Sequence, residues 1–186
     1  MRCSVSGCGN EADLARIEVS GRRVVREDAF CQQHGRISLE HSFAQEHVGS
    51  GSTTRLEGAV CFDVELVVLR FKDDCSDIFV REVGGVRLFQ WRIGYYESLC
   101  ICGALKIAPH PRPMTHEVPA RILAALGGVL EYIVVDRYDE AINAHHAQLM
   151  VQHRSGSVQV DVRPSDALAI AIYTGVPFFI LETLLP

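Results

Sequence analysis

Three cysteines and a histidine near the start of the chain constrain its folding more than any other feature of the sequence. Cys3, Cys8, Cys31 and His34 form the pattern C-x4-C-x22-C-x2-H. Thiolate and imidazole groups are the ligands that Zn2+ prefers, and four of them complete a tetrahedron without leaving a position for water. We therefore predict a structural zinc site. The competing interpretation is a set of free thiols beside a surface histidine.

The residues between these ligands predict a small module that needs the metal. Two short strands are expected at Leu14–Val19 and Arg23–Asp28, and a helix is expected to run from Cys31 towards Gln45. A unit of about 50 residues buries little apolar surface, so it usually depends on a metal or another staple.

A stretch rich in Gly, Ser and Thr follows this module and is typical of a flexible linker. We place the linker at 49–57, between a zinc-binding module at 1–48 and a second domain at 58–186. The chain of 186 residues has room for both.

The second domain alternates strand-like and helix-like patterns, which indicates an α+β fold with a compact mixed sheet and packed helices. Strands are expected at 60–71, 77–83, 86–93, 129–136, 143–153, 157–163 and 177–181, and helices at 94–106, 115–126 and 166–174. Thr115 and Ser165 are the predicted N-caps of the last two helices. The final helix, ALAIAI, is apolar all round and should be buried.

Charge and hydropathy restrict the classes of function. The chain has 18 Lys plus Arg against 23 Asp plus Glu, a net charge of −5. This acidity argues against a protein that coats nucleic acid or anionic membrane by charge alone. No apolar run is long enough for a transmembrane helix, and no secretory signal is recognised at the N-terminus. We therefore expect no membrane association and a cytoplasmic location, where clustered cysteines favour metal binding over disulfides.

Polar residues of catalytic type gather in two otherwise hydrophobic segments, PRPMTHE (111–117) and VDVRPSD (160–166). The candidates are Arg112, His116, Glu117, Asp161, Arg163, Ser165 and Asp166. Spacing alone favours a structural interpretation, with helix caps and an Asp161–Arg163 ion pair, because such features are commoner than catalytic sites.

Four segments carry a resemblance to a known family: IGYYES (93–98), RPMTHE (112–117), VDVRPSDALAIAI (160–172) and GVPFFILETLL (175–185). In their order and spacing they resemble the bifunctional nuclease domain family of bacteria and plants. The resemblance implies a compact α+β domain that cleaves DNA and RNA and self-associates. It also adds Glu97 to the candidate site. The N-terminal segment resembles small bacterial zinc modules, which implies a zinc-ribbon-like adaptor.

The resulting hypothesis is a metal-assisted nuclease that hydrolyses phosphodiester bonds of DNA or RNA. Asp161, Glu117 or Glu97 would hold Mg2+ or Mn2+. His116 would act as general base or acid, and the arginines of the two segments would clamp phosphate oxygens. The expected partners are nucleic acid, further copies of the chain through the C-terminal domain, and a protein bound by the zinc module. The alternative is a non-catalytic binding or regulatory protein whose zinc module and acidic domain mediate protein contacts.

Several further residues are expected to have structural roles. Cys100 and Cys102 are predicted to be buried thiols, and His145 and His146 should point to opposite faces of a strand with no partner that the sequence identifies. The aromatic residues around Tyr95 could stack on bases, but in this position they are more often part of a core or an interface.

Overall fold

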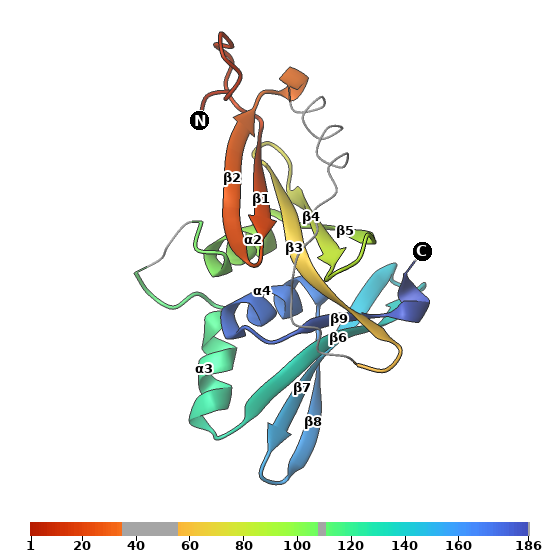
Figure 1. The fold of residues 1–186 in the computed structure, drawn as a ribbon. Helices are drawn as coiled ribbons and strands as arrows, with labels where there is room; N and C mark the ends of the chain where they lie inside the picture. The colour runs from red at the N-terminus through yellow and green to blue at the C-terminus, as the bar shows by residue number, and fades with distance from the viewer. Residues whose placement is uncertain (35–55, 108–110, 186) are drawn as a thin grey trace. The chain divides into compact units, whose positions relative to one another are not determined.

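The computed structural model describes residues 1–34, 56–107 and 111–185. It has a mixed sheet with packed helices, so the α+β prediction is confirmed (Figure 1). The chain divides into two compact units, Met1–Gly51 with Asp63–Ser98, and Ser52–Phe62 with Leu99–Pro186. Most of the predicted linker lies outside the described residues, and the predicted domain boundaries remain a prediction.

The first unit is built on five strands in the order β2-β1-β3-β4-β5. They are β1 (Leu14–Ser20), β2 (Arg23–Phe30), β3 (Ala59–Arg70), β4 (Cys75–Glu82) and β5 (Leu88–Gly94). The β1–β2 hairpin turns at Gly21 and Arg22, which both have positive φ, as a tight two-residue hairpin turn requires. Strand β1 pairs antiparallel with β2 and with β3, so the predicted hairpin belongs to a larger sheet.

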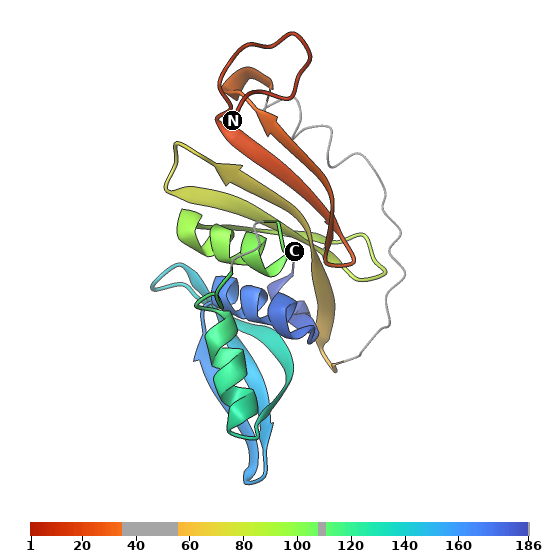
Figure 2. The ribbon, with the colours of Figure 1, turned by 90° about the vertical axis from the view of Figure 1, so that its left-hand side faces the viewer.

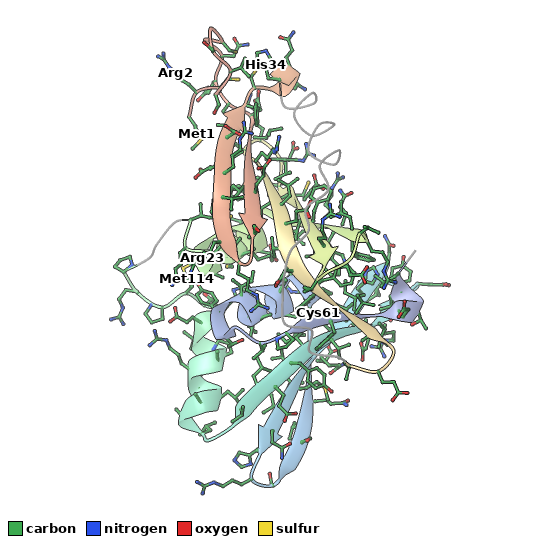
Figure 3. The ribbon with its side chains drawn as sticks, viewed as in Figure 1. Met1, Arg2, Arg23, His34, Cys61 and Met114 are labelled. Carbon is green, nitrogen blue, oxygen red and sulfur yellow. The ribbon has the colours of Figure 1, made fainter. Side chains whose placement is uncertain are left out.

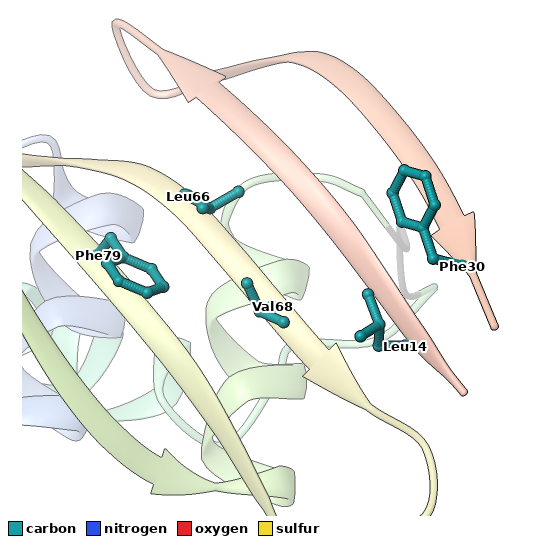
Figure 4. Close-up of a cluster of buried hydrophobic side chains, with 5 residues drawn as sticks. All are labelled: Leu14, Phe30, Leu66, Val68 and Phe79. Atoms are coloured by element: carbon teal, nitrogen blue, oxygen red, sulfur yellow. The ribbon is translucent and has the colours of Figure 1, made fainter. Parts of the chain in front are cut away.

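A cluster of apolar side chains fills part of this unit, as Figure 4 shows. It comprises Leu14, Phe30, Leu66, Val68 and Phe79, with Leu88 packed against it. Leu14 lies directly opposite Phe30, and Leu66 and Val68 are two residues apart on one face of β3. Complete burial of an aliphatic or aromatic side chain contributes about 1.5–3 kcal/mol, so this cluster is a main source of stability in the unit.

The second unit contains the two segments of candidate catalytic residues. Its strands are the start of β3, β6 (Val129–Asp139), β7 (Ala144–His153), β8 (Gly156–Val162) and β9 (Phe178–Leu181), in the order β3-β9-β6-β7-β8. Strand β9 is parallel to β6, whereas the β6–β7 and β7–β8 pairs are antiparallel.

Helices cover one face of this sheet. Helix α4 (Pro164–Thr174) packs against β6 and β7, and α3 (Glu117–Ala125) packs against α4 and β6, as Figures 1 and 2 show. Residues Ala167–Ala171 of α4 are buried, which confirms the prediction made from its apolar sequence. Helix α2 (Tyr95–Ala104) has its first four residues in the first unit and the rest in the second. A 3-10 turn at Glu182–Leu184 ends the described chain.

Both predicted N-caps are wrong. Helix α3 is preceded by His116 rather than Thr115, and α4 is preceded by Arg163 with Pro164 in its first turn. Neither helix start has a capping hydrogen bond from a side chain. The restricted φ of proline suits a first helical position, which explains why α4 begins before Ser165. Gly175 ends α4 with a φ of 79°, the left-handed conformation that glycine commonly adopts at a helix C-terminus.

Two further observations bear on the sequence predictions. Residues 32–34 are helical, and the remainder of the helix expected towards Gln45 lies outside the described residues. Across the described parts of the chain, no helix is both long enough and apolar enough to cross a bilayer.

Candidate functional site

The four N-terminal ligands converge on one point of the first unit. Their candidate ligand atoms, three Sγ and one imidazole nitrogen, all lie within 4.8 Å of one another. Cys8 Sγ is 3.9 Å from Cys31 Sγ, and His34 Nδ1 is 3.4 Å from Cys3 Sγ and 3.5 Å from Cys31 Sγ. A tetrahedral zinc ion with ordinary bond lengths gives S···S separations of about 3.8 Å and S···N separations of about 3.6 Å. The residues therefore fit a closed metal site.

The hairpin brings these ligands together. Cys3 and Cys8 precede β1, and Cys31 and His34 follow β2, so the pairing of the two strands returns the chain to its start. Figure 3 shows His34 at the same end of the hairpin as Met1 and Arg2, with Arg23 at the opposite end. Backbone bonds from Cys3 N to Asn10 O and from Cys8 N to Val5 O shape the ligand loop.

Two of the three thiols, Cys3 and Cys31, favour the ionised thiolate that a metal requires, whereas the pKa of Cys8 is raised. Burial alone would raise the pKa of Cys3, but hydrogen bonds from the backbone N–H groups of Cys31 and Val5 and from His34 lower it to about 6. The pKa of Cys31 is also lowered, first through a backbone hydrogen bond from His34. The hydrogen bond with Cys3 raises the pKa of His34. Such thiols bind metal readily near neutral pH.

In the second unit, the two candidate segments meet at the starts of α3 and α4. His116 Nε2 lies 2.7 Å from Asp166 Oδ1, although the residues are 50 positions apart. Arg163 binds the same carboxylate with two nitrogens, Nε to Oδ2 at 2.7 Å and a terminal nitrogen to Oδ1 at 3.1 Å. A carboxylate can accept such paired bonds from one guanidinium. The structure therefore joins His116, Arg163 and Asp166 in one group, which we call the His116 cluster.

Electrostatics favour the ionised form of Asp166. Burial would raise the pKa of this carboxyl, but the hydrogen bonds from Arg163 and His116 outweigh it, and the pKa is lowered. Asp166 is therefore an anion near neutral pH and accepts a hydrogen bond from His116 Nε2. The other ring nitrogen, Nδ1, is buried and has no hydrogen-bond partner among the described residues. A buried polar atom without a partner costs about 1–3 kcal/mol, so this atom can gain from a bound water or hydroxyl group.

Asp161 lies outside this cluster and has partners that the sequence did not identify. Asp161 Oδ1 is 3.3 Å from His146 Nδ1 and 3.3 Å from Gln148 Nε2, both on the adjacent strand β7. Asp139 approaches the other side of the His146 ring, at 3.9 Å from Nε2. His146 therefore has carboxylate partners that the sequence did not identify. Strand register places His146 and Asp161 on one face, and this register could not be predicted from either strand alone.

The remaining candidates are dispersed. Glu117 Oε1 accepts a bond of 2.8 Å from Arg121 Nε, one turn further along α3. Arg112 is exposed in the segment before α3, and Ser165 is half-buried in the first turn of α4. Glu97 lies in the part of α2 that belongs to the first unit, and its carboxylate occupies the space that a Cβ on Gly94 would need.

The carboxylates do not form a second metal cage. Within residues 1–34, 56–107 and 111–185, the N-terminal cluster is the one set of three or more His, Cys, Asp or Glu side chains that converges closely enough to hold an ion. The expectation that Asp161, Glu117 or Glu97 holds Mg2+ or Mn2+ stays a prediction.

Comparisons with known proteins agree with the sequence resemblance. The model of the bifunctional nuclease domain matches residues 78–186, which is more than half of the chain and includes every candidate catalytic residue. Two uncharacterized proteins of Mycobacterium tuberculosis, from strains CDC 1551 / Oshkosh and H37Rv, are each 32% identical to this chain over 108 residues. These matches cover 58% of this chain and 63% of each relative, so the chain spans less than two thirds of the relatives' length.

Proposed function

Because the chain belongs to the bifunctional nuclease domain family, we propose that it hydrolyses phosphodiester bonds in DNA or RNA at the His116 cluster. The observation that carries the proposal is the 2.7 Å contact between His116 Nε2 and Asp166 Oδ1, with Arg163 on the same carboxylate. These residues come from the two segments that carry the family resemblance.

The arrangement supports general acid–base chemistry by His116. Asp166 accepts a hydrogen bond from Nε2–H, which fixes the tautomer and leaves the lone pair on Nδ1. A water molecule or a ribose hydroxyl hydrogen-bonded to Nδ1 could lose its proton to this atom as its oxygen bonds to phosphorus. The P–O bond to the leaving ester oxygen breaks in the same displacement, and the imidazolium then returns the proton to that oxygen or to solvent. Asp166 would stabilise the resulting imidazolium and hold the ring in position, as a carboxylate does in a catalytic triad. Asp166 is thus a positioning residue and His116 the general base.

Arg163 supplies positive charge to the phosphate. Its side chain is 65% exposed, and it is held at the start of α4 by Asp166. The guanidinium has five N–H donors, so it can bind Asp166 and still donate to a non-bridging phosphate oxygen. Exposed Arg112 would be a second phosphate contact. The step proposed for His116 does not require a carboxylate-bound Mg2+ or Mn2+.

The N-terminal module would bind one structural Zn2+ through Cys3, Cys8, Cys31 and His34. Four protein ligands leave no open position on the ion, so this zinc would organise the hairpin and take no part in hydrolysis. We place the protein in the cytoplasm, where a reducing environment keeps such thiolates available to the metal.

The test is a cleavage assay with the purified full chain. Single-stranded RNA and plasmid DNA are incubated with Mg2+, with Mn2+ and with chelator, using wild type, His116→Gln and Asp166→Asn. His153→Gln is the matched control, because this histidine is half-buried at the end of β7 and its side chain bonds only locally to Ser155 among its described contacts. We expect cleavage by wild type and His153→Gln, and a loss of about 100-fold or more in His116→Gln.

The same assay identifies a wrong assignment. Equal cleavage by wild type and both cluster variants would mean that the activity comes from a contaminant or from another site. An Asp161→Asn variant separates the two histidine–aspartate pairs, because it perturbs His146 and leaves the His116 cluster intact.

A second candidate function is that of a binding protein without catalysis, and one feature of α3 favours it. Val118, Ile122 and Leu126 recur at four-residue intervals and are 41%, 54% and 71% exposed, and none of the α3 residues is buried. Such a stripe is typical of a helix that binds another surface. Contacts with a partner protein or between copies of the chain would use it. This function would be supported if the wild-type protein shows no cleavage but self-associates, and if the Ile122→Lys variant no longer self-associates.

A further inference from the structure

Two rings pack against each other in the second unit, where β6 ends and β7 begins. The centroids of Tyr138 and His145 are 4.9 Å apart with planes inclined at 52°. The two residues pair directly across the strands, so their side chains share a face. Tyr138 is 41% exposed, so a ligand can reach part of this residue.

The local structure fixes the orientation of this pair. Tyr138 Oη donates a hydrogen bond to Asn143 Oδ1 across the β6–β7 turn. Asn143 has a φ of 51°, which its short polar side chain tolerates, and Ala141 N–H donates to Asp139 Oδ1 at 2.9 Å to close the turn. Desolvation lowers the pKa of His145, so its ring is neutral near pH 7 and stacks without carrying charge. A ring held in advance loses little entropy when a planar ligand binds.

The strand register places this pair near the start of α4. Pairing between β7 and β8 begins, in the chain order of β7, at Ala147, which lies opposite Val162. Arg163 comes directly after Val162 in the chain. His145 precedes Ala147 by two positions, so it lies on the same face of β7, about 7 Å away along the strand. Because Ala147 is buried on the face that α4 covers, the Tyr138–His145 pair lies on that face as well.

From these observations we propose that Tyr138, backed by His145, is a stacking subsite for an unpaired base of single-stranded nucleic acid whose phosphate is bound by Arg163. Bases inside a duplex already stack on their neighbours, whereas an unpaired base can stack on an aromatic side chain. The subsite therefore selects single-stranded DNA or RNA over duplex. The inference rests on the proposed function only in taking nucleic acid as the ligand.

The test measures binding without cleavage. A fluorescein-labelled single-stranded oligothymidylate and a matched abasic strand, both with phosphorothioate linkages that resist hydrolysis, are titrated without chelator, and Kd is read by fluorescence anisotropy. Stacking is worth about 1–3 kcal/mol per base, so Tyr138→Ala should weaken binding of the base-containing strand by about 5- to 150-fold. Binding of the abasic strand should not change. Tyr138→Phe keeps the ring and should stay within about threefold of wild type.

Phe71→Ala is the matched control, because Phe71 is 38% exposed and belongs to the first unit. Wild-type protein gives a readout that does not depend on the folding of any variant. Photocrosslinking to a strand that contains 5-bromouracil should join the base to the peptide that carries Tyr138, as mapped by mass spectrometry.

Three outcomes would overturn the subsite: no binding of the oligonucleotide by wild type, an equal effect of Tyr138→Ala on both strands, or crosslinks only elsewhere. Failure of the proposed hydrolysis is distinguishable. Base-dependent binding without cleavage would retain the subsite and exclude the activity. Cleavage by the wild type, together with an unchanged Kd in Tyr138→Ala, would retain the activity and exclude the subsite.

Discussion

Replacing Asp166 with asparagine should destabilise the second unit by an amount that the structure allows us to work out. The bond from His116 involves a charged acceptor in a half-buried setting and is worth about 1.5–3 kcal/mol. The paired bonds from Arg163 are largely exposed, and they add about 0–1 kcal/mol. Asparagine keeps one acceptor oxygen, but its side-chain NH2 group takes the place of the other oxygen and faces the Arg163 guanidinium or His116. We expect a net loss of about 2–3 kcal/mol in the free energy of unfolding.

The measurement is urea unfolding followed by circular dichroism, with Asp73→Asn as the control. Asp73 is exposed in the turn between β3 and β4, and a surface change of this kind should stay within about 0.5 kcal/mol of wild type. A loss below about 0.5 kcal/mol in Asp166→Asn would refute the view that these bonds outweigh the burial of the carboxylate.

The pH dependence provides a second check of the same reasoning. The pKa of Asp166 is lower in the folded chain than its ordinary value, so its ionised form stabilises the fold above the unfolded pKa of about 3.9. This contribution is lost as the pH falls through the folded pKa. The difference in stability between wild type and Asp166→Asn should therefore be present in full at pH 7 and shrink progressively as the pH falls below about 4 towards the folded pKa. A difference that is unchanged at pH 3 would contradict the assignment.

Three further predictions concern other parts of the molecule. Metal analysis should find about one zinc per chain, and Cys31→Ser should lose it; full zinc retention in this variant would exclude Cys31 as a ligand. Phe178→Ala removes a side chain that is 1% exposed and should cost about 3–5 kcal/mol in urea unfolding. Gly175→Ala forces a φ of 79° on a residue with a Cβ and should lower stability by about 1 kcal/mol, although no neighbouring atom obstructs the new group.

Local patterns predicted the elements of the fold with good agreement. The alternation of apolar and polar residues located β1, β2 and β7 within a few residues of their observed ends, and the apolar sequence of α4 correctly indicated burial. These features depend on neighbours in the chain, so periodicity is sufficient to find them. The first residues of the helices were harder to predict from sequence. Thr115 and Ser165 have side chains suited to capping, but in the structure His116 and Arg163 occupy the N-cap positions.

Contacts between distant segments could not be predicted from spacing. Asp166 accepts a hydrogen bond from His116, 50 positions away in the chain, because α3 packs against α4. This packing is a property of the tertiary structure. Spacing favoured an ion pair between Asp161 and Arg163, yet Arg163 binds Asp166 and Asp161 faces His146. Both outcomes depend on strand register and on the turn at Pro164. The family resemblance identified the right segments but could not show which of their residues touch.

The position of the four zinc ligands has a consequence for how the N-terminal part of the chain responds to its surroundings. Cys3 and His34 are 31 positions apart, and both ends of the hairpin meet at the cluster. A bound ion would thus act as a clasp that closes this part of the chain into a ring. Unlike a disulfide, the clasp opens when a stronger chelator removes the metal, and no covalent bond is broken. The pairing of β1 with β3 would still hold the hairpin in place without the metal. Only residues 1–13 would become less ordered, and their degree of order would depend on the concentration of free zinc.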